Sequence, residues 1–396
     1  MTWRRALADW KELDQRRPAA WWLGLSGTIA GALALAALEL ARIAPRGPAR
    51  WILLAGLLLA VVAVGRRVFW NDAERRLRLP WRLAGFVVVV ILLQMAASAV
   101  GLRIGPRELG RGSAAALRVS LTVLAMLTIA TLVAVRLFDR RPVRELGIVP
   151  APGFWGDLAF GLALGSVLMT LIFAVEWNAG WLRIDAIAYT RAPGEAFRGA
   201  FWRMAGVFAC VGFYEELVNR GYLLRTMAQG FVGRRLRAPY ALAIAVVLSS
   251  LLFALGHVNN PNASLVSTLN IVFEGIVLAL PYVLTGRLAV SIGFHIAWNF
   301  FQSTVYGFPT SGFESPASAF LIEQGGPAGW TGGAFGPEAG LLGLLALLFA
   351  AAAILWRERR RSGRVALCTA LVESDRPAFT SATTGSPSAS PAAPAS

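Results

Sequence analysis

The sequence has few charged side chains for its length. Only 15% of its 396 residues are Asp, Glu, Lys or Arg, whereas about 25% is usual in soluble domains. Hydrophobic residues make up 56%, and the mean hydropathy is +0.59. This balance excludes an ordinary soluble domain and is typical of a polytopic membrane protein.

Cysteine, histidine and lysine are also scarce. The two cysteines, Cys210 and Cys368, imply no disulfide framework. Lys11 is the only lysine, so the net charge of +16 comes from arginine, which suggests a bacterial coding history. The arginines lie between apolar runs and not in one basic stripe, which argues against nucleic acid as a partner. Both histidines, His257 and His295, lie in or at the end of apolar runs.

Apolar runs long enough to cross a bilayer, about 17 to 25 residues, recur along the whole chain. We therefore expect an all-α fold, a polytopic transmembrane helical bundle of about eight to ten helices. The two shortest runs, 51–65 and 340–356, are the weakest predictions. The predicted spans are 20–42, 51–65, 81–102, 117–137, 155–176, 200–224, 239–257, 265–285, 288–306 and 340–356.

The distribution of arginine predicts an orientation in the membrane. Cytoplasmic loops are enriched in Lys and Arg, and arginines cluster at 66–82, 136–144, 225–237 and 357–361. We therefore predict that both termini are cytoplasmic and that the protein lies in a bacterial inner membrane. Residues 307–339 contain no Lys or Arg, as expected of an external loop. Four arginines depart from this pattern on the external side: Arg103, Arg107, Arg111 and Arg118.

One predicted span carries three charges, in the stretch FYEELVNRGYLL at 213–224. A charge at the bilayer centre costs roughly 2.5 to 3.5 kcal/mol, so it normally faces the protein interior and has a partner. Glu216 and Arg220 are four residues apart and share a helical face, which predicts an ion pair. Glu215 points about 100° away. The spacing thus leaves Glu215 free to act.

Two further segments place polar side chains in apolar runs. His257 ends SSLLFALGH, and His295 and Asn299 lie four apart in HIAWN. Each alone fits interhelical hydrogen bonding, but together with the charged span they favour a shared site. Glu215 with His257 could activate water, and His295 with Asn299 could hold the oxyanion of a tetrahedral intermediate. Glu274, another acid in a span, could line a substrate route or form a hydrogen bond to a neighbouring helix, and we favour the second interpretation.

The three motifs together resemble a known family. EELVNR at 215–220 matches EExxxR, FALGH at 253–257 matches FxxxH, and HIAWN at 295–299 matches HxxxN. In this order, over about 195–306, they resemble the CAAX-processing and bacteriocin-processing (CPBP) intramembrane glutamic endopeptidases. This family includes CaaX prenyl proteases and Abi-type proteins.

The resemblance implies a protease without metal or cofactor. By motif, Glu215 would activate water with help from His257, while His295 and Asn299 would form the oxyanion site. Glu216 and Arg220 would support them. The substrate would be a membrane-anchored peptide or protein, cleaved near the cytoplasmic side. The sequence does not identify this substrate.

The resemblance also divides the chain. The five predicted parts are N-terminal accessory helices at 1–140, the protease core at 141–306, the external loop at 307–339, a last helix with its basic flank at 340–364, and a disordered tail at 365–396. One point conflicts with a single site. Glu215 and His295 fall nearer the cytoplasmic ends of their spans and His257 nearer an external end, so a helix must tilt or begin elsewhere.

Three other functions stay open. Two histidines and a glutamate form a common catalytic zinc set, although the sequence has no HExxH pair and Arg220 would disfavour a dication. A transporter or receptor could use the same buried cluster as a proton relay or ligand site. A non-enzymatic immunity or scaffold protein could bind its partner through these helices.

Overall fold

The computed structural model describes residues 65, 68–71, 74–105, 108, 111–150, 152–232 and 236–373. The predicted span at 20–42, nearly all of the span at 51–65, and most of the predicted tail lie outside these residues.

The remaining eight predicted spans all coincide with helices. Their boundaries agree to within a few residues when the π-helical continuations of α8 to Leu224 and of α12 to Val305 are included, except that the last helix continues through its arginines to Ser362. In chain order the helices are α4 (Leu79–Ala99), α6 (Ser113–Val133), α7 (Phe154–Asn178), α8 (Phe197–Glu216), α10 (Ala238–Leu255), α11 (Leu265–Thr285), α12 (Ala289–Asn299) and α14 (Leu341–Ser362). The helical bundle predicted from composition is therefore confirmed.

Six of these helices are long and apolar enough to cross a membrane: α4, α6 with its continuation to Phe138, α7, α10, α11 and α14. Side chains on their outer faces are apolar as well as exposed; Val87, Leu171 and Phe349 are examples. An apolar exterior is stable in lipid and not in water. The chain is thus an integral membrane protein.

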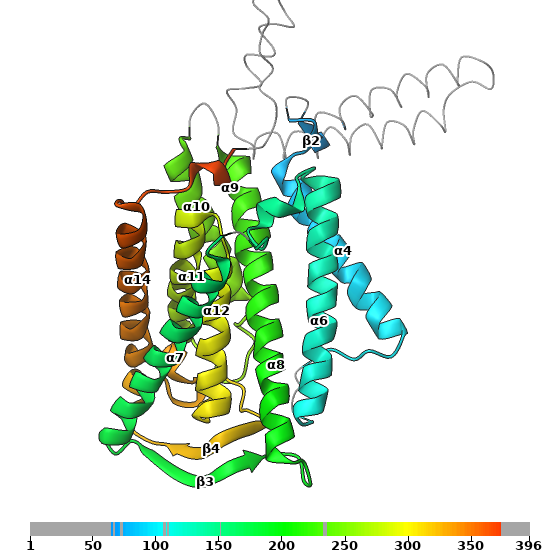
Figure 1. Ribbon diagram of the computed structural model, residues 1–396. Coiled ribbons are helices and arrows are strands. Elements are labelled where there is room, and N and C mark those ends of the chain that lie inside the picture. The colour runs from blue at the N-terminus through cyan, green and yellow to red at the C-terminus, as the bar shows by residue number, and fades with distance from the viewer. Residues whose placement is uncertain are drawn as a thin grey trace, which may run out of the picture.

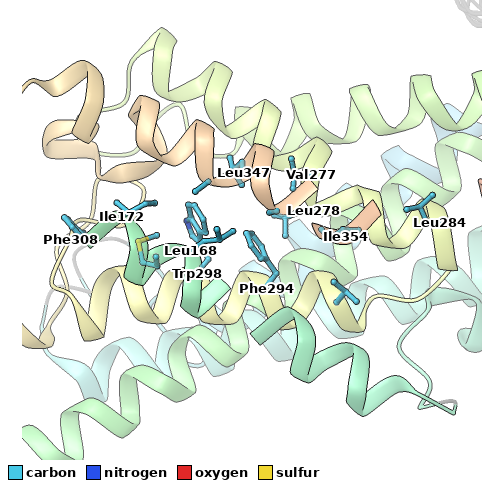
Figure 2. Packing of buried hydrophobic residues seen from close by; sticks show 14 of the residues in the cluster. Leu168, Ile172, Val277, Leu278, Leu284, Phe294, Trp298, Phe308, Leu347 and Ile354 are labelled. Carbon is cyan, nitrogen blue, oxygen red and sulfur yellow. The ribbon is translucent and has the colours of Figure 1, made fainter. Parts of the chain in front are cut away.

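The tightest helix packing joins α7 to α12. Glycines at the crossing bring the two backbones together, because a Cβ at Gly161 would lie 2.3 Å from the carbonyl oxygen of Val290. Gly293 on α12 faces α7 in the same way, 2.3 Å from the carbonyl oxygen of Leu158. Small residues permit such close approach between membrane helices. Beside this crossing, Phe294 and Trp298 pack into the largest core cluster, with side chains of α7, α11 and α14 (Figure 2).

A two-stranded ribbon lies across one end of the bundle (Figure 1). Strand β3 (Leu182–Thr190) pairs antiparallel with β4 (Ala317–Gln324), although about 130 residues separate them. Neither strand is predicted from the sequence, because β4 lies in the predicted external loop at 307–339 and β3 lies between two predicted spans. The 307–339 segment also contains short helical turns, at Ala328–Thr331, Gly333–Phe335 and Pro337–Ala339. We refer to this end as the ribbon face; it also includes 256–264, whose Asn260 side chain donates to the carbonyl of Ser311.

The opposite end of the bundle is rich in arginine. It comprises α9 (Arg225–Phe231), residues 139–150, the turn 286–288 and residues 363–373, and we call it the basic face. Backbone hydrogen bonds join its parts, such as Leu288 N to the Gly147 carbonyl and Cys368 N to the Val283 carbonyl. Its ion pairs include those of Asp157 with Arg287, Arg357 and Arg361, and those of Asp139 with Arg82 and Arg141.

The close contact at Gly293 predicts that one added methyl group lowers the stability of the protein. We expect Gly293→Ala to lower the thermal stability of the detergent-purified protein, because overpacking a tight contact costs about 1 to 3 kcal/mol. Gly156→Ala on α7 is the matched control, since a Cβ there meets nothing within 4 Å. Thermal unfolding of both variants beside wild type would measure the difference. Equal melting temperatures for the two variants would contradict the packing argument.

Candidate active site

The ion pair predicted between Glu216 and Arg220 is confirmed. Glu216 is the last residue of α8, and a π-helical segment, η3 (Leu217–Leu224), follows it directly. Arg220 Nη1 donates to Glu216 Oε1 at 2.8 Å, and both side chains are fully buried. Arg220 also donates to the carbonyl of Gly275 on α11 at 3.1 Å and lies over the ring of Phe253 on α10. The pair thereby links three helices behind the site.

Glu215 faces a different environment from its neighbour. Its side chain is 21% exposed and lines a cavity, whereas that of Glu216 is 0% exposed. This difference follows from the helix, in which consecutive residues point about 100° apart. Glu215 Oε2 lies 3.6 Å from His295 Nε2. Of the two glutamates, only Glu215 can therefore meet a substrate.

His295 connects the two glutamates. Its Nδ1 lies 2.8 Å from Glu216 Oε1, and its Nε2 faces Glu215. An ionised carboxylate only accepts hydrogen bonds, so the proton of this contact belongs to His295 Nδ1. Glu216, held in turn by Arg220, therefore fixes the orientation of the ring.

His257 lies just beyond the end of α10 at Leu255. Its Nδ1 is 2.8 Å from the Phe253 carbonyl, which can only accept, so Nδ1 carries the proton. In the neutral ring Nε2 is then an acceptor. Within the described part of the chain, no hydrogen bond or ion pair joins Glu215 directly to His257.

The predicted site residues meet at one cavity of about 1010 Å³. Glu215, His257, His295 and Asn299 all line it, while Glu216 and Arg220 lie behind them. Asn299 is the last residue of α12, one turn beyond His295. His257 lines this cavity with the others although α10 begins and ends within two residues of its predicted span, so the conflict did not come from misplaced ends of that helix.

Two further acids at this cavity had no role in the predicted site. Glu274 of α11 lines the cavity, and no hydrogen bond from it to a neighbouring helix is found among the described residues. Its position fits the alternative that it lines a substrate route better than the favoured interhelical hydrogen bond. Glu338 also lines the cavity and accepts from the backbone and hydroxyl of Ser311 at 2.8 and 2.9 Å. Glu338 lies in the 307–339 segment, where no motif or residue spacing in the sequence marks it as a site residue.

A protein-bound metal ion needs several His, Cys, Asp or Glu side chains close together. Among residues 65–373 as described, no group of three or more His, Cys, Asp and Glu side chains could hold one.

The fold and the site together define a membrane-embedded protein with ionisable groups at an internal cavity. Residues 197–301 match the family model described as type II CAAX prenyl endopeptidase Rce1-like. The match extends from the start of α8 past Asn299 and includes all three motifs. It confirms the predicted resemblance and supports a membrane endopeptidase. Searches of curated proteins and of solved structures found no match.

The buried pair predicts that the two adjacent glutamates differ in their effect on stability. We expect Glu216→Gln to destabilise the protein strongly, because removing one partner of a buried ion pair typically costs about 3 to 5 kcal/mol. Glu215→Gln should leave stability nearly unchanged, since its carboxylate faces the cavity. Thermal unfolding in detergent would compare the two. Similar losses in both variants would contradict the assigned roles.

Glu338 predicts a pH dependence of stability. Burial raises the pKa of the Glu338 carboxyl, although the Ser311 hydrogen bonds oppose this shift. Because the folded state then holds its proton more tightly than the unfolded state, this group stabilises at low pH. Its contribution is lost as pH rises from the ordinary glutamate pKa through the raised one.

We therefore expect wild type to lose stability relative to Glu338→Gln as pH rises above about 4.3, the ordinary glutamate pKa. Melting temperatures of both proteins across this range would measure the difference. His257, Glu274 and His295 also interact with Glu338 electrostatically, so the comparison with Glu338→Gln isolates its contribution. Parallel curves for the two proteins would contradict this prediction.

Proposed function

We propose that the protein is an intramembrane glutamic endopeptidase that hydrolyses a peptide bond of a membrane-anchored peptide or protein. The observation that carries this proposal is the meeting of Glu215, His257, His295 and Asn299 at one cavity, on side chains from three different helical segments. A second carboxylate, Glu216, orients one of the histidines.

The nucleophile in this scheme is a water molecule between Glu215 and His257. The Glu215 carboxylate accepts a proton from the water, and His257 Nε2 accepts a hydrogen bond from it. The water oxygen forms a bond to the scissile carbonyl carbon, giving a tetrahedral intermediate. Collapse of the intermediate breaks the C–N bond, and the proton on Glu215 passes to the leaving amine. The products are a carboxylate and an amine, with no covalent enzyme intermediate.

Asn299 and His295 stabilise the negative oxygen of the intermediate. The Asn299 amide donates directly from the cavity wall. His295 donates from Nε2 as an imidazolium, with its Nδ1 proton held by Glu216. Preorganisation makes such donors effective, and the Glu216–Arg220 pair supplies it by fixing the ring before substrate arrives.

This scheme requires neither a metal nor a cofactor. Water is activated by the carboxylate and the imidazole, and charge on the intermediate is balanced by side-chain donors. We therefore propose metal-independent hydrolysis. The residues supporting it are the same four that line the cavity.

The scheme predicts graded losses of turnover. We expect Glu215→Gln and His257→Ala to abolish cleavage, because each removes a group that activates water. His295→Ala or Asn299→Ala should lower turnover by about 10²- to 10³-fold, the usual loss of an oxyanion donor. The measurement is cleavage of a quenched fluorescent peptide library, including lipidated peptides, by detergent-purified protein.

A zinc chelator provides the discriminating condition in that assay. Wild-type cleavage should be unchanged by the chelator, while loss of cleavage would assign the reaction to a metal. Cleavage retained in Glu215→Gln would contradict the glutamate mechanism. Solute uptake by proteoliposomes, abolished by the same substitution and without cleavage of any peptide, would instead support a transporter.

A further inference from the structure

We propose that the cavity receives its substrate from the extracytoplasmic side, so that the substrate is a membrane-anchored protein or peptide whose scissile bond lies outside the cytoplasm. This inference rests on the proposed function for the existence of a substrate. Its geometric part, the side on which the cavity lies, is independent of that function.

The first step is the position of the cavity in the bundle. Its walls come from α6, α8, α10, α11 and α12, and its outer part is built by the ribbon face. Asn260 and Pro261 follow α10, Thr310–Ser315 lie before β4, and Arg191 lies directly after β3. Among the described residues that line it, none belongs to α9 or to 139–150, 286–288 or 363–373 of the basic face.

The second step is the distribution of charge between the two faces. The last turns of α14 and the residues after it carry Arg357, Arg359, Arg360, Arg361 and Arg364 at the basic face. At the ribbon face, two whole connections, 256–264 and 306–340, contain no Lys or Arg. The enrichment of basic residues in cytoplasmic loops therefore places the basic face in the cytoplasm and the ribbon face outside.

Several of the arginines at the ribbon face are paired with acids. Arg183 contacts both Asp185 and Glu323, and Arg191 contacts Glu314. These contacts join two arginines to three acids. Near the start of α6, Arg111 and Arg118 share Glu108, and Arg203 contacts Glu195. The contacts offset part of the positive charge at the ribbon face, and 256–264 and 306–340 add no arginine to it.

The orientation changes the predicted class of substrate. Cleavage near the cytoplasmic side, expected from the family resemblance, conflicts with the position of the cavity once the basic face is cytoplasmic. A peptide entering over 256–264 and 309–316 would approach from the outer surface. This route suits an exported precursor or the outer juxtamembrane segment of an anchored protein, and not a lipidated C-terminus presented in the cytoplasm.

Thiol labelling tests the orientation without requiring peptidase activity. Cys210 and Cys368 are replaced by Ala, and single cysteines are introduced at Ile187 on β3, at Asn259 beside His257, and at Val365 beyond α14. All three positions are exposed. Right-side-out membrane vesicles from bacteria expressing the full chain are treated with a membrane-impermeant maleimide, and inside-out vesicles receive the same treatment.

We expect Ile187→Cys and Asn259→Cys to react in right-side-out vesicles and Val365→Cys to react only in inside-out vesicles. The reverse pattern would overturn the inference. Detergent-permeabilised samples, in which all three cysteines should react, control for local accessibility.

The side of substrate access is then measured with an impermeant fluorogenic peptide that the detergent-purified enzyme cleaves. Cleavage should occur in right-side-out vesicles, be at least tenfold slower in inside-out vesicles, and vanish with Glu215→Gln. Faster cleavage in inside-out vesicles would overturn the inference. Absence of any cleavage by the purified enzyme would contradict the proposed function, while the labelling pattern would still decide the orientation.

Discussion

The arrangement of the site depends on one buried carboxylate. Glu216 accepts from Arg220 of the following π segment and from His295 of α12. Arg220 extends the connection to the Gly275 carbonyl of α11 and to the ring of Phe253 on α10. A charge buried within the bundle without a partner would be costly. Each member of the cluster therefore holds the others in position. The cluster therefore couples the packing of four helical segments to the orientation of one imidazole.

The two adjacent glutamates lie in different environments because consecutive residues of a helix point about 100° apart. Glu216 is sealed within the bundle, and Glu215 reaches the cavity. The division is reinforced by the two histidines, whose Nδ1 atoms are both occupied, one by Glu216 and the other by the Phe253 carbonyl. Neither of these two contacts occupies the Nε2 atom of its ring. In the proposed mechanism this atom has different roles, as acceptor in His257 and as donor in the imidazolium form of His295.

The parts of this structure that the sequence predicted are those set by local periodicity. Apolar runs predicted eight of the described helices, and the four-residue spacing of Glu216 and Arg220 predicted their ion pair. The β3–β4 ribbon was missed because each strand finds its partner about 130 residues away, which no local pattern records. Glu338 joins the cavity for the same non-local reason, through the fold of the 307–339 segment. The π segments that follow Glu216 and Asn299 were missed as well, although such distortions are frequent at functional sites.

The contrast between the two faces connects the fold to the chemistry. The proposed hydrolysis needs water at a carboxylate within the bundle, and the ribbon face supplies polar loops at that end of the cavity. The basic face instead closes the other end with ion pairs, among them Asp157 with three arginines from two segments. These pairs join the start of α7 to the α11–α12 turn and to the end of α14. The described lining of the cavity comes from the helices and the ribbon face and not from the basic face, so, for the proposed peptidase, the side on which the ribbon lies determines which proteins can reach Glu215.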